Sequence, residues 1–323
     1  MKLKKSKNNV LVVGDVMIDI IIKFRHNEKI FFHGANFHKE GRISFGGAGN
    51  IAVAAAMLGI EKVSMVGAIG EDPFGYAYLL DLQNHGVTPF IFEKEKSSTG
   101  FVISLVHENG ERTFIVHRGA NDLLSKNDVE KALLKFKPEV LFVNGHGVAT
   151  SQRDALIWII KHAKKIGSTI VYDPGSYNVI KGQQELIINE FLRYTDIFLP
   201  NLEEAKAITR SNSIEEVKER LPKLVNISII KMGREGALLL RNFKNHVEIK
   251  HIPTLDVPAV DTTGAGDAFA AAVLYGLCKG IDIKKAILLG CLIGAYVVRG
   301  YGPRHLPSRN QIKDWVKEYL EGK

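Results

Sequence analysis

The residues with the clearest potential for chemistry lie in the stretch 257–276, VPAVDTTGAGDAFAAAVLYG. A short apolar segment leads through DTT (261–263) into the turn Gly264–Ala265–Gly266, and Asp267 follows in the first turn of an expected apolar helix. A glycine-rich turn before a helix leaves backbone N–H groups unpaired, and the helix dipole favours an anion there. A carboxylate normally repels such an anion, so its presence indicates selection for chemistry. We therefore predict that Asp267 is a catalytic base beside a phosphate-binding turn.

Each of these features also has a purely structural interpretation, since Asp is common in first helical turns and Gly-Ala-Gly permits tight packing. Their combination favours phosphoryl transfer, which requires neutralised charge and a group that accepts the proton of the attacking hydroxyl. The N–H groups of Ala265 and Gly266 would stabilise the transferred phosphoryl group, and Asp267 would accept the proton. Because Asp267 is expected at a helix N-terminus, we predict a low pKa and a permanently ionised carboxylate.

Two polar segments follow expected strands at 197–200 and 227–230. Asn201 and Glu204 open a helix, and their spacing fits both a capping box and a ligand-binding pair. The segment KMGREG (231–236) is, on its residues alone, typical of a hairpin loop with glycines at positive φ.

Other candidates stand singly. Asn144 and Asp173 each follow an expected strand, at the edge where α/β sheets bind ligands. Arg118 closes an expected hairpin and either reaches an acidic substrate or is solvated. Asp19 lies among isoleucines, so it either has hydrogen-bond partners or faces water on an edge strand. Asn50 follows a cluster of glycines and either caps a helix or binds a ligand hydroxyl.

The composition is that of an ordinary globular protein, with 323 residues, 46% hydrophobic and 24% charged. The net charge of +8 suits acidic small molecules. Nucleic acid is disfavoured, because the chain has no zinc-finger spacing, basic helix or RNA-binding aromatic motif. P-loop, dinucleotide and protein-kinase motifs are absent as well. Without a signal-peptide cleavage site or an apolar run long enough to span a membrane, we expect a cytoplasmic protein with no membrane partner.

The order of expected elements predicts an α/β fold. From residue 139 onward strands alternate with helices, which indicates a mostly parallel sheet with helices on both faces. Residues 100–118 read as a hairpin around Asn109–Gly110. We expect a single domain over 1–323, with a small β lid contributed by about 16–45 and 99–118.

Six segments, taken together and in this order, resemble the ribokinase-like carbohydrate kinases, the PfkB family. They are GDVMID (14–19), GGAGN (46–50), GEDPFG (70–75), NLEE (201–204), KMGREG (231–236) and DTTGAGD (261–267). The resemblance runs from Val10 to about Pro303. It implies a central sheet of eight or nine strands with a β lid, and ATP-dependent phosphorylation of a sugar-like hydroxyl with Mg²⁺.

The resemblance also implies roles for individual residues. Asp267 corresponds to the family's base, which also faces the substrate, and Gly264, Ala265 and Gly266 to its anion hole. Asn201 and Glu204 correspond to the pair that organises Mg²⁺, indirectly, and the phosphates. The remaining residues fall into three groups: Lys231, Gly233, Gly236 and Thr263 for ATP; Asp15, Asp19, Gly46, Gly47, Asn50, Arg118 and Asn144 for the substrate; Asp261 and Thr263, with the 297–302 segment, for the K⁺ that some members bind.

The chain departs from the ribokinase pattern in two places, which leaves the substrate open. Its glycine motif is one residue shorter than GGKGAN, and Met17 stands where ribokinases tend to have Asn. Met17 and the Phe-rich loop 31–37 would suit a nucleobase, whereas Arg25, Arg42 and Arg118 would suit a carboxylate or phosphate. We expect an ATP-dependent kinase of a pentose, hexose or sugar acid, dimeric through its lid. The alternatives are a nucleoside kinase and a non-catalytic ligand-binding homologue.

Overall fold

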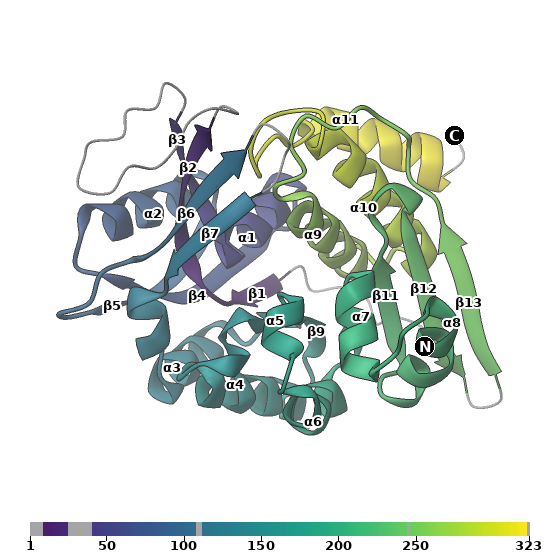
Figure 1. The fold of residues 1–323 in the computed structure, drawn as a ribbon, viewed down its shortest axis with the longest axis horizontal. Coiled ribbons are helices and arrows are strands. Elements are labelled where there is room, and N and C mark those ends of the chain that lie inside the picture. Colours follow the sequence, from purple (N-terminus) through teal and green to yellow (C-terminus); the bar gives the residue numbers. More distant parts are fainter. Residues whose placement is uncertain (1–8, 25–40, 108–111, 244–245, 322–323) are drawn as a thin grey trace.

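A nine-stranded sheet forms the centre of the protein (Figure 1). The computed structural model describes residues 9–24, 41–107, 112–243 and 246–321. In spatial order the strands are β13 (His246–Ile252), β12 (Ala237–Phe243), β11 (Ile227–Lys231), β10 (Ile197–Phe198), β9 (Thr169–Asp173), β8 (Val140–Asn144), β1 (Asn9–Val13), β4 (Lys62–Gly70) and β5 (Val87–Lys94). From β11 to β5 all pairs are parallel, and β12 and β13 add antiparallel pairs at one edge.

Helices cover both faces of this sheet, as expected (Figure 1). One face carries α1 (Ala48–Met57), α2 (Pro73–Asn84), α9 (Ala265–Cys278), α10 (Ile283–Val297) and α11 (Arg309–Trp315). The other carries α3 (Lys126–Phe136), α4 (Arg153–Lys165), α5 (Tyr177–Ile180), α6 (Gln184–Leu186), α7 (Leu202–Thr209) and α8 (Ile214–Arg220). None of the helices in the described residues has the length and apolar character needed to cross a membrane.

The sheet is apolar on both sides because its parallel strands are buried on both sides. In β1, Val10 and Val12 pack into one core, whereas Leu11 and Val13 pack into the other. β8 divides its side chains between the two cores in the same way. These continuous apolar runs are therefore explained by the two helical layers.

A second, four-stranded sheet lies beside the large one (Figure 1). Its order is β3 (Gly41–Gly47), β2 (Val16–Phe24), β6 (Gly100–His107) and β7 (Arg112–His117). β2 pairs antiparallel with β3 and parallel with β6, so it is an interior strand. The pairing of β6 with β7 confirms the expected hairpin, whose turn at 108–111 is outside the described residues, as is the Phe-rich loop 31–37.

The start of α1 excludes one of the two roles expected for Asn50. Gly47, at φ 66°, precedes α1, which begins at Ala48, so Asn50 lies inside the first turn and does not cap the helix. The segment GEDPFG (70–75) contains the start of α2, which begins at Pro73, and the side chain of the preceding Asp72 accepts a hydrogen bond from the Gly75 amide (2.9 Å).

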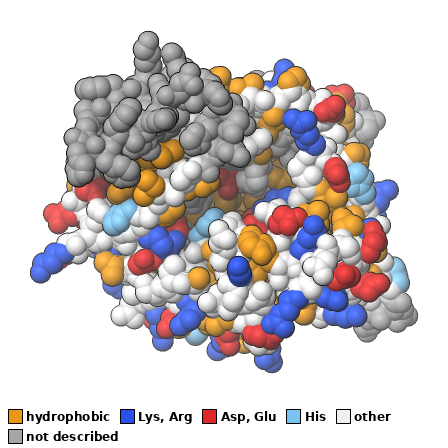
Figure 2. Space-filling view, in the orientation of Figure 1, with side chains coloured by type: hydrophobic (Ala, Val, Ile, Leu, Met, Phe, Trp, Pro, Cys, Tyr) orange, Lys and Arg blue, Asp and Glu red, His pale blue; other side chains and the backbone are white. Residues whose placement is uncertain are grey.

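The sheet topology places a cleft at the carboxyl ends of the strands. β1 lies between β4 and β8, so the order of the strands reverses at β1. α/β sheets bind ligands at such a reversal of strand order. Polar residues lie at the carboxyl ends of these strands: Asn144, Asp173 and Lys231 are the last residues of β8, β9 and β11, and Asp15 and Asn201 follow shortly after β1 and β10. The space-filling view is hollowed near the centre of this face, with an acidic side chain inside the hollow (Figure 2).

Candidate active site

The N-terminus of α9 has the geometry of an anion site. Gly264 precedes it at φ 80°, and a side chain there would collide with Pro303. The amides of Gly266 and Asp267 make no hydrogen bond with a described residue, whereas the Ala265 amide, expected to be free, donates to the Thr262 carbonyl (3.3 Å). Two unpaired amides at a helix start attract an anion.

Asp267 lies in the first turn of α9, partly open to solvent although protein atoms surround most of it. Its Oδ2 lies 3.4 Å from the Asn50 amide nitrogen. Burial raises the pKa of Asp267 to about 7, and the Asp173 carboxylate adds to this, against the opposing effect of Lys231. The low pKa expected from the helix N-terminus is therefore wrong, because desolvation and a like charge outweigh the helix dipole.

Lys231 lies beside Asp267, and the carboxylates of Asp173 and Glu204 lie near Lys231. The Lys231 Nζ is 2.6 Å from Asp173 Oδ2. Glu204 is only 2% exposed, and burial raises its pKa to about 7. Glu204 and Asn201 also form the capping box, with the Asn201 amide donating to Glu204 Oε2 (2.7 Å) and the Glu204 amide to Asn201 Oδ1 (2.8 Å). The pair thus has a structural role, which does not conflict with a ligand role.

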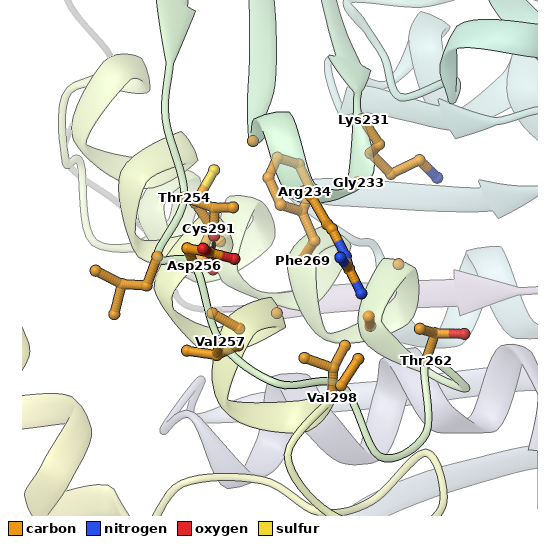
Figure 3. Close-up of a pocket in the computed structure, with 18 residues that line it drawn as sticks. Lys231, Gly233, Arg234, Thr254, Asp256, Val257, Thr262, Phe269, Cys291 and Val298 are labelled. Carbon is orange, nitrogen blue, oxygen red and sulfur yellow. Dashed lines mark hydrogen bonds between the residues drawn. The ribbon is translucent and has the colours of Figure 1, made fainter.

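A mainly apolar pocket of about 250 Å³ adjoins the Gly266 amide (Figure 3). Lys231, Gly233 and Gly236 of the 231–236 loop line one side, and Ala265 and Gly266 belong to another. Its apolar walls include Val257, Phe269 and Val298, with Arg234 reaching along the same side as Lys231 (Figure 3). Such a pocket suits a flat aromatic ring, with the amides of α9 at its polar end.

On the other side of Asp267, the small sheet contributes Asp19. Asp19 is on the interior strand β2, so the edge-strand alternative is wrong. Burial raises its pKa to about 6. No described residue donates a hydrogen bond to its carboxylate, and Gly46 leaves room that a Cβ would fill. The carboxylate is thus available to the hydroxyls of a ligand.

The match to known proteins covers almost the whole chain. A family model described as pfkB family carbohydrate kinase matches residues 7–309. The chain belongs to the pfkB family of carbohydrate kinases. It is 29% identical to the ATP-dependent 6-phosphofructokinase of Thermoanaerobacterium thermosaccharolyticum (95% of this chain, 94% of the relative) and 26% identical to the ribokinase of Lactococcus lactis (96% and 97%).

A solved adenosine kinase from Sinorhizobium meliloti has the same fold, with a TM-score of 0.83 at 22% identity over 96% of this chain and 99% of that one. These findings confirm the expected family, fold and class of enzyme, an ATP-dependent kinase. Because the relatives phosphorylate different acceptors by name, they leave the acceptor of this chain open.

Two predicted substrate residues of this pfkB kinase are paired with each other. Asp15 is 5% exposed, and its two carboxylate oxygens accept from Arg118 Nη1 (2.7 Å) and Nη2 (2.9 Å). Asp122 accepts from Arg118 Nε (2.7 Å). Asn144 Oδ1 lies 2.6 Å from His146 Nδ1 and accepts from the His146 amide. Contact of these side chains with substrate stays a prediction. In the structure they form hydrogen bonds with one another and with neighbouring residues near the strand ends.

The residues predicted for a monovalent cation also lie together. Asp261 Oδ1 accepts from the amide (2.9 Å) and hydroxyl (2.6 Å) of Thr263, and Oδ2 from the Gly302 amide (3.0 Å). The Thr263 hydroxyl is thus used within the turn. Among the described residues no group of three or more His, Cys, Asp or Glu side chains is arranged to hold a metal ion. K⁺ binding here stays a prediction.

Sequence reasoning missed Arg304. Its Nε donates to Asn50 Oδ1 (3.2 Å), a terminal nitrogen donates to Asp81, and the guanidinium lies 5.4 Å from the centre of the Phe45 ring. The position of Arg304 along the sequence after DTTGAGD did not indicate its contact with Asn50, because that contact depends on how the loop after α10 folds back over α1.

The pKa of Asp267 makes a prediction about stability. The pKa of the Asp267 carboxyl is 3.8 in the unfolded chain and about 7 in the folded protein. Between these two pH values the folded state therefore binds one more proton than the unfolded state. Stability therefore falls as pH rises through this window. Asp267→Asn removes that loss, so its free energy of unfolding should exceed that of the wild type by on the order of 1 kcal/mol at pH 8 and by less at pH 5.

Urea denaturation at the two pH values measures this difference. The exposed carboxylate of Asp314 provides the matched control, since Asp314→Asn should change stability little at either pH. A constant difference between Asp267→Asn and the wild type would contradict the raised pKa.

Proposed function

We propose that this pfkB kinase transfers the γ-phosphoryl group of ATP to a hydroxyl of a sugar, with Asp267 accepting the hydroxyl proton. The observation that supports this most directly is the position of the first turn of α9. Ala265 and Gly266 line the apolar pocket, whereas the next residue, Asp267, contacts Asn50 on the side of Asp19. One helical turn thus separates a nucleotide site from a hydroxyl-binding site, as phosphoryl transfer requires.

The apolar pocket suits the nucleotide. Val257, Phe269 and Val298 would contact the adenine ring, and the phosphates would extend towards the free Gly266 amide and Lys231. A Cβ on Gly266 would meet only Lys231 Nζ, at 3.9 Å, so Lys231 lies across the open space in front of Gly266. The amides and the ammonium would stabilise charge that develops on the transferred phosphoryl group.

The residues present also fit Mg²⁺ bound through the phosphates. Asp173 and Glu204 lie near Lys231 and carry more negative charge than this one ammonium neutralises. Without a cluster of three ligands in the described residues, Glu204 and Asn201 would hold the ion indirectly, through phosphate or water. Mg²⁺ would there neutralise phosphate charge.

The environment of Asp267 suits a general base near neutral pH. A carboxyl with a pKa of about 7 is a stronger base than an ordinary one and is still ionised in a large fraction of molecules. Asn50 donates towards Oδ2 and so leaves Oδ1 for the substrate hydroxyl. Because the transition state of phosphoryl transfer is loose, the proton moves late, and Asp267 would both orient the hydroxyl and accept its proton.

A sugar is the acceptor that the described residues favour. The unpaired carboxylate of Asp19 suits a pair of hydroxyls, whereas Met17 is 6% exposed and does not offer the apolar wall expected for a nucleobase. The loop 31–37 and Arg25 lie outside the described residues. Arg118 is neutralised by Asp15 and Asp122, and Arg42 stacks on Tyr301, 4.4 Å from the ring centre.

An ADP-release screen of sugars, sugar acids, sugar phosphates and nucleosides tests the proposal that the acceptor is a sugar, and activity on nucleosides alone would overturn it.

Replacement of the base tests the mechanism. Asp267→Asn should lower turnover by about three orders of magnitude, because it removes the proton acceptor and keeps the shape of the side chain. ATP binding, measured by calorimetry, should change little, since the pocket and the Gly266 amide remain. Turnover within a few-fold of the wild type would remove Asp267 as the base.

Glu204→Gln separates the two roles of Glu204. Glutamine retains an oxygen that can accept from the Asn201 amide, so the cap should survive and the melting temperature should stay close to that of the wild type. Loss of the charge should raise the Mg²⁺ concentration for half-maximal activity about 10-fold. Glu203→Gln, at the exposed neighbouring position, is the control and should change neither. A lower melting temperature with unchanged Mg²⁺ dependence would leave only the capping role.

The proposal includes a homodimer formed through the small sheet. Ile43, Ile20, Ile103 and Ile115 are register partners across its four strands, so they share the face opposite Asp19. Ile43 and Ile115 are 67% and 54% exposed, and β7 is an edge strand of this sheet. An apolar row with an open strand edge favours pairing with a second copy of the same sheet.

The oligomeric state can be measured by light scattering after gel filtration. The wild type should elute as a dimer and Ile115→Glu as a monomer, because a charge in the apolar row must be desolvated on pairing. Leu134→Glu introduces the same charge at an exposed leucine on α3 and should leave the dimer intact. A monomeric wild type would contradict the proposal.

A further inference from the structure

Asn50 lies between a carboxylate and a guanidinium. Its amide nitrogen faces Asp267 Oδ2 (3.4 Å), and its amide oxygen accepts from Arg304 Nε (3.2 Å). An asparagine amide can turn by half a rotation with little change of shape, which exchanges donor and acceptor. Here only one orientation is favourable, because the other would place oxygen against a carboxylate and N–H groups against a guanidinium.

Arg304 is itself firmly held from two sides. A terminal nitrogen donates to Asp81 on α2, and the guanidinium lies over the Phe45 ring of β3. Its Nη2 is buried and has no hydrogen-bond partner among the described residues. Leaving a buried guanidinium nitrogen unpaired costs stability, so this placement indicates a role other than stabilising the fold.

The planar guanidinium is the group that can make both contacts. It presents donors in several directions from a rigid plane, so Nε reaches Asn50 while a terminal nitrogen reaches Asp81. A lysine ammonium at this position would pair with Asp81 and would not hold the direction to Asn50. The contact therefore depends on the shape of arginine as well as on its charge.

We propose that Arg304 is a positioning residue that fixes the amide of Asn50 with its N–H groups towards Asp267, and so keeps the base in place and ionised for the substrate hydroxyl. The inference rests on the proposed function for its effect on catalysis. Without Arg304, the amide turns or becomes mobile, and Asp267 loses a donor that lowers its pKa. The other groups that face Asp267 are Asp173 on β9, Lys231 on β11 and Asp19 on β2. Of these, Asp19 also responds to Arg304, whose charge lowers the pKa of Asp19, and the comparison with the Asn50→Ala background separates this charge effect from the effect through Asn50.

A double-mutant cycle with Asn50 tests this directly. In the wild-type background Arg304→Gln should lower kcat/KM about 10-fold, whereas in an Asn50→Ala background the same change should lower it less than about 2-fold. Arg304→Lys should behave like Arg304→Gln. Equal effects in both backgrounds, or wild-type activity of Arg304→Lys, would overturn the proposal.

A matched control comes from the same C-terminal segment. Arg309 donates to the carbonyls of Met57 (3.2 Å) and Ala56 (3.1 Å) at the other end of α1. Arg309→Gln therefore removes a guanidinium that contacts the same helix far from Asp267. It should lower the melting temperature at unchanged kcat/KM, which shows how a purely structural arginine behaves.

A readout in the resting protein separates this inference from the proposed function. ¹³C NMR of the Asp267 carboxyl follows its titration without any substrate. Its pKa should rise in Arg304→Gln and should not respond to the same change in Asn50→Ala. If Asp267→Asn retained turnover, the role of the base would fail while this coupling could still be present. A pKa that responds equally in both backgrounds would show a direct charge effect and would overturn the positioning role.

Discussion

The site depends on an imbalance of charge, because Asp173, Glu204 and Asp267 share the ammonium of Lys231. One cation cannot neutralise three carboxylates in a partly desolvated cleft. Burial raises the pKa of Glu204 and Asp267 to about 7, and the charge of Asp173 adds to this rise in both. Such a site is unfavourable when empty and becomes more favourable when a cation arrives. Under the proposed function, Mg²⁺ bound to the phosphates of the nucleotide would place positive charge beside these carboxylates.

The large sheet is what allows these groups to meet. Asp173, Asn201 and Lys231 come from neighbouring parallel strands and reach the same edge because parallel strands end together. Helix α9, packed on one face, adds the amides and Asp267, and the small sheet adds Asp19. The rigid layers thus determine distances between residues far apart in sequence, and the reactive groups lie on the ends of elements and in short turns.

Much of this arrangement could be predicted from local sequence, and the rest could not, because it depends on contacts between distant segments. The turn before α9, the capping pair at α7 and the alternation of strands and helices are encoded within a few residues, so they were predictable. The pairing of Asp15 with Arg118 and the contact of Arg304 with Asn50 depend on how distant segments pack. The low pKa expected for Asp267 was wrong because a helix dipole is visible in sequence, whereas the carboxylate on a distant strand and the depth of burial are not.

The contacts of Asn50 have a consequence for how the protein is made. Its partners Asp267 and Arg304 lie 217 and 254 residues further along the chain. During synthesis the early strands can begin to pair while the ribosome is still far from these residues, but Asn50 does not have both partners until translation has passed residue 304. The nascent chain therefore remains without the complete set of contacts around Asn50 through most of its elongation, and this set is completed in one late step.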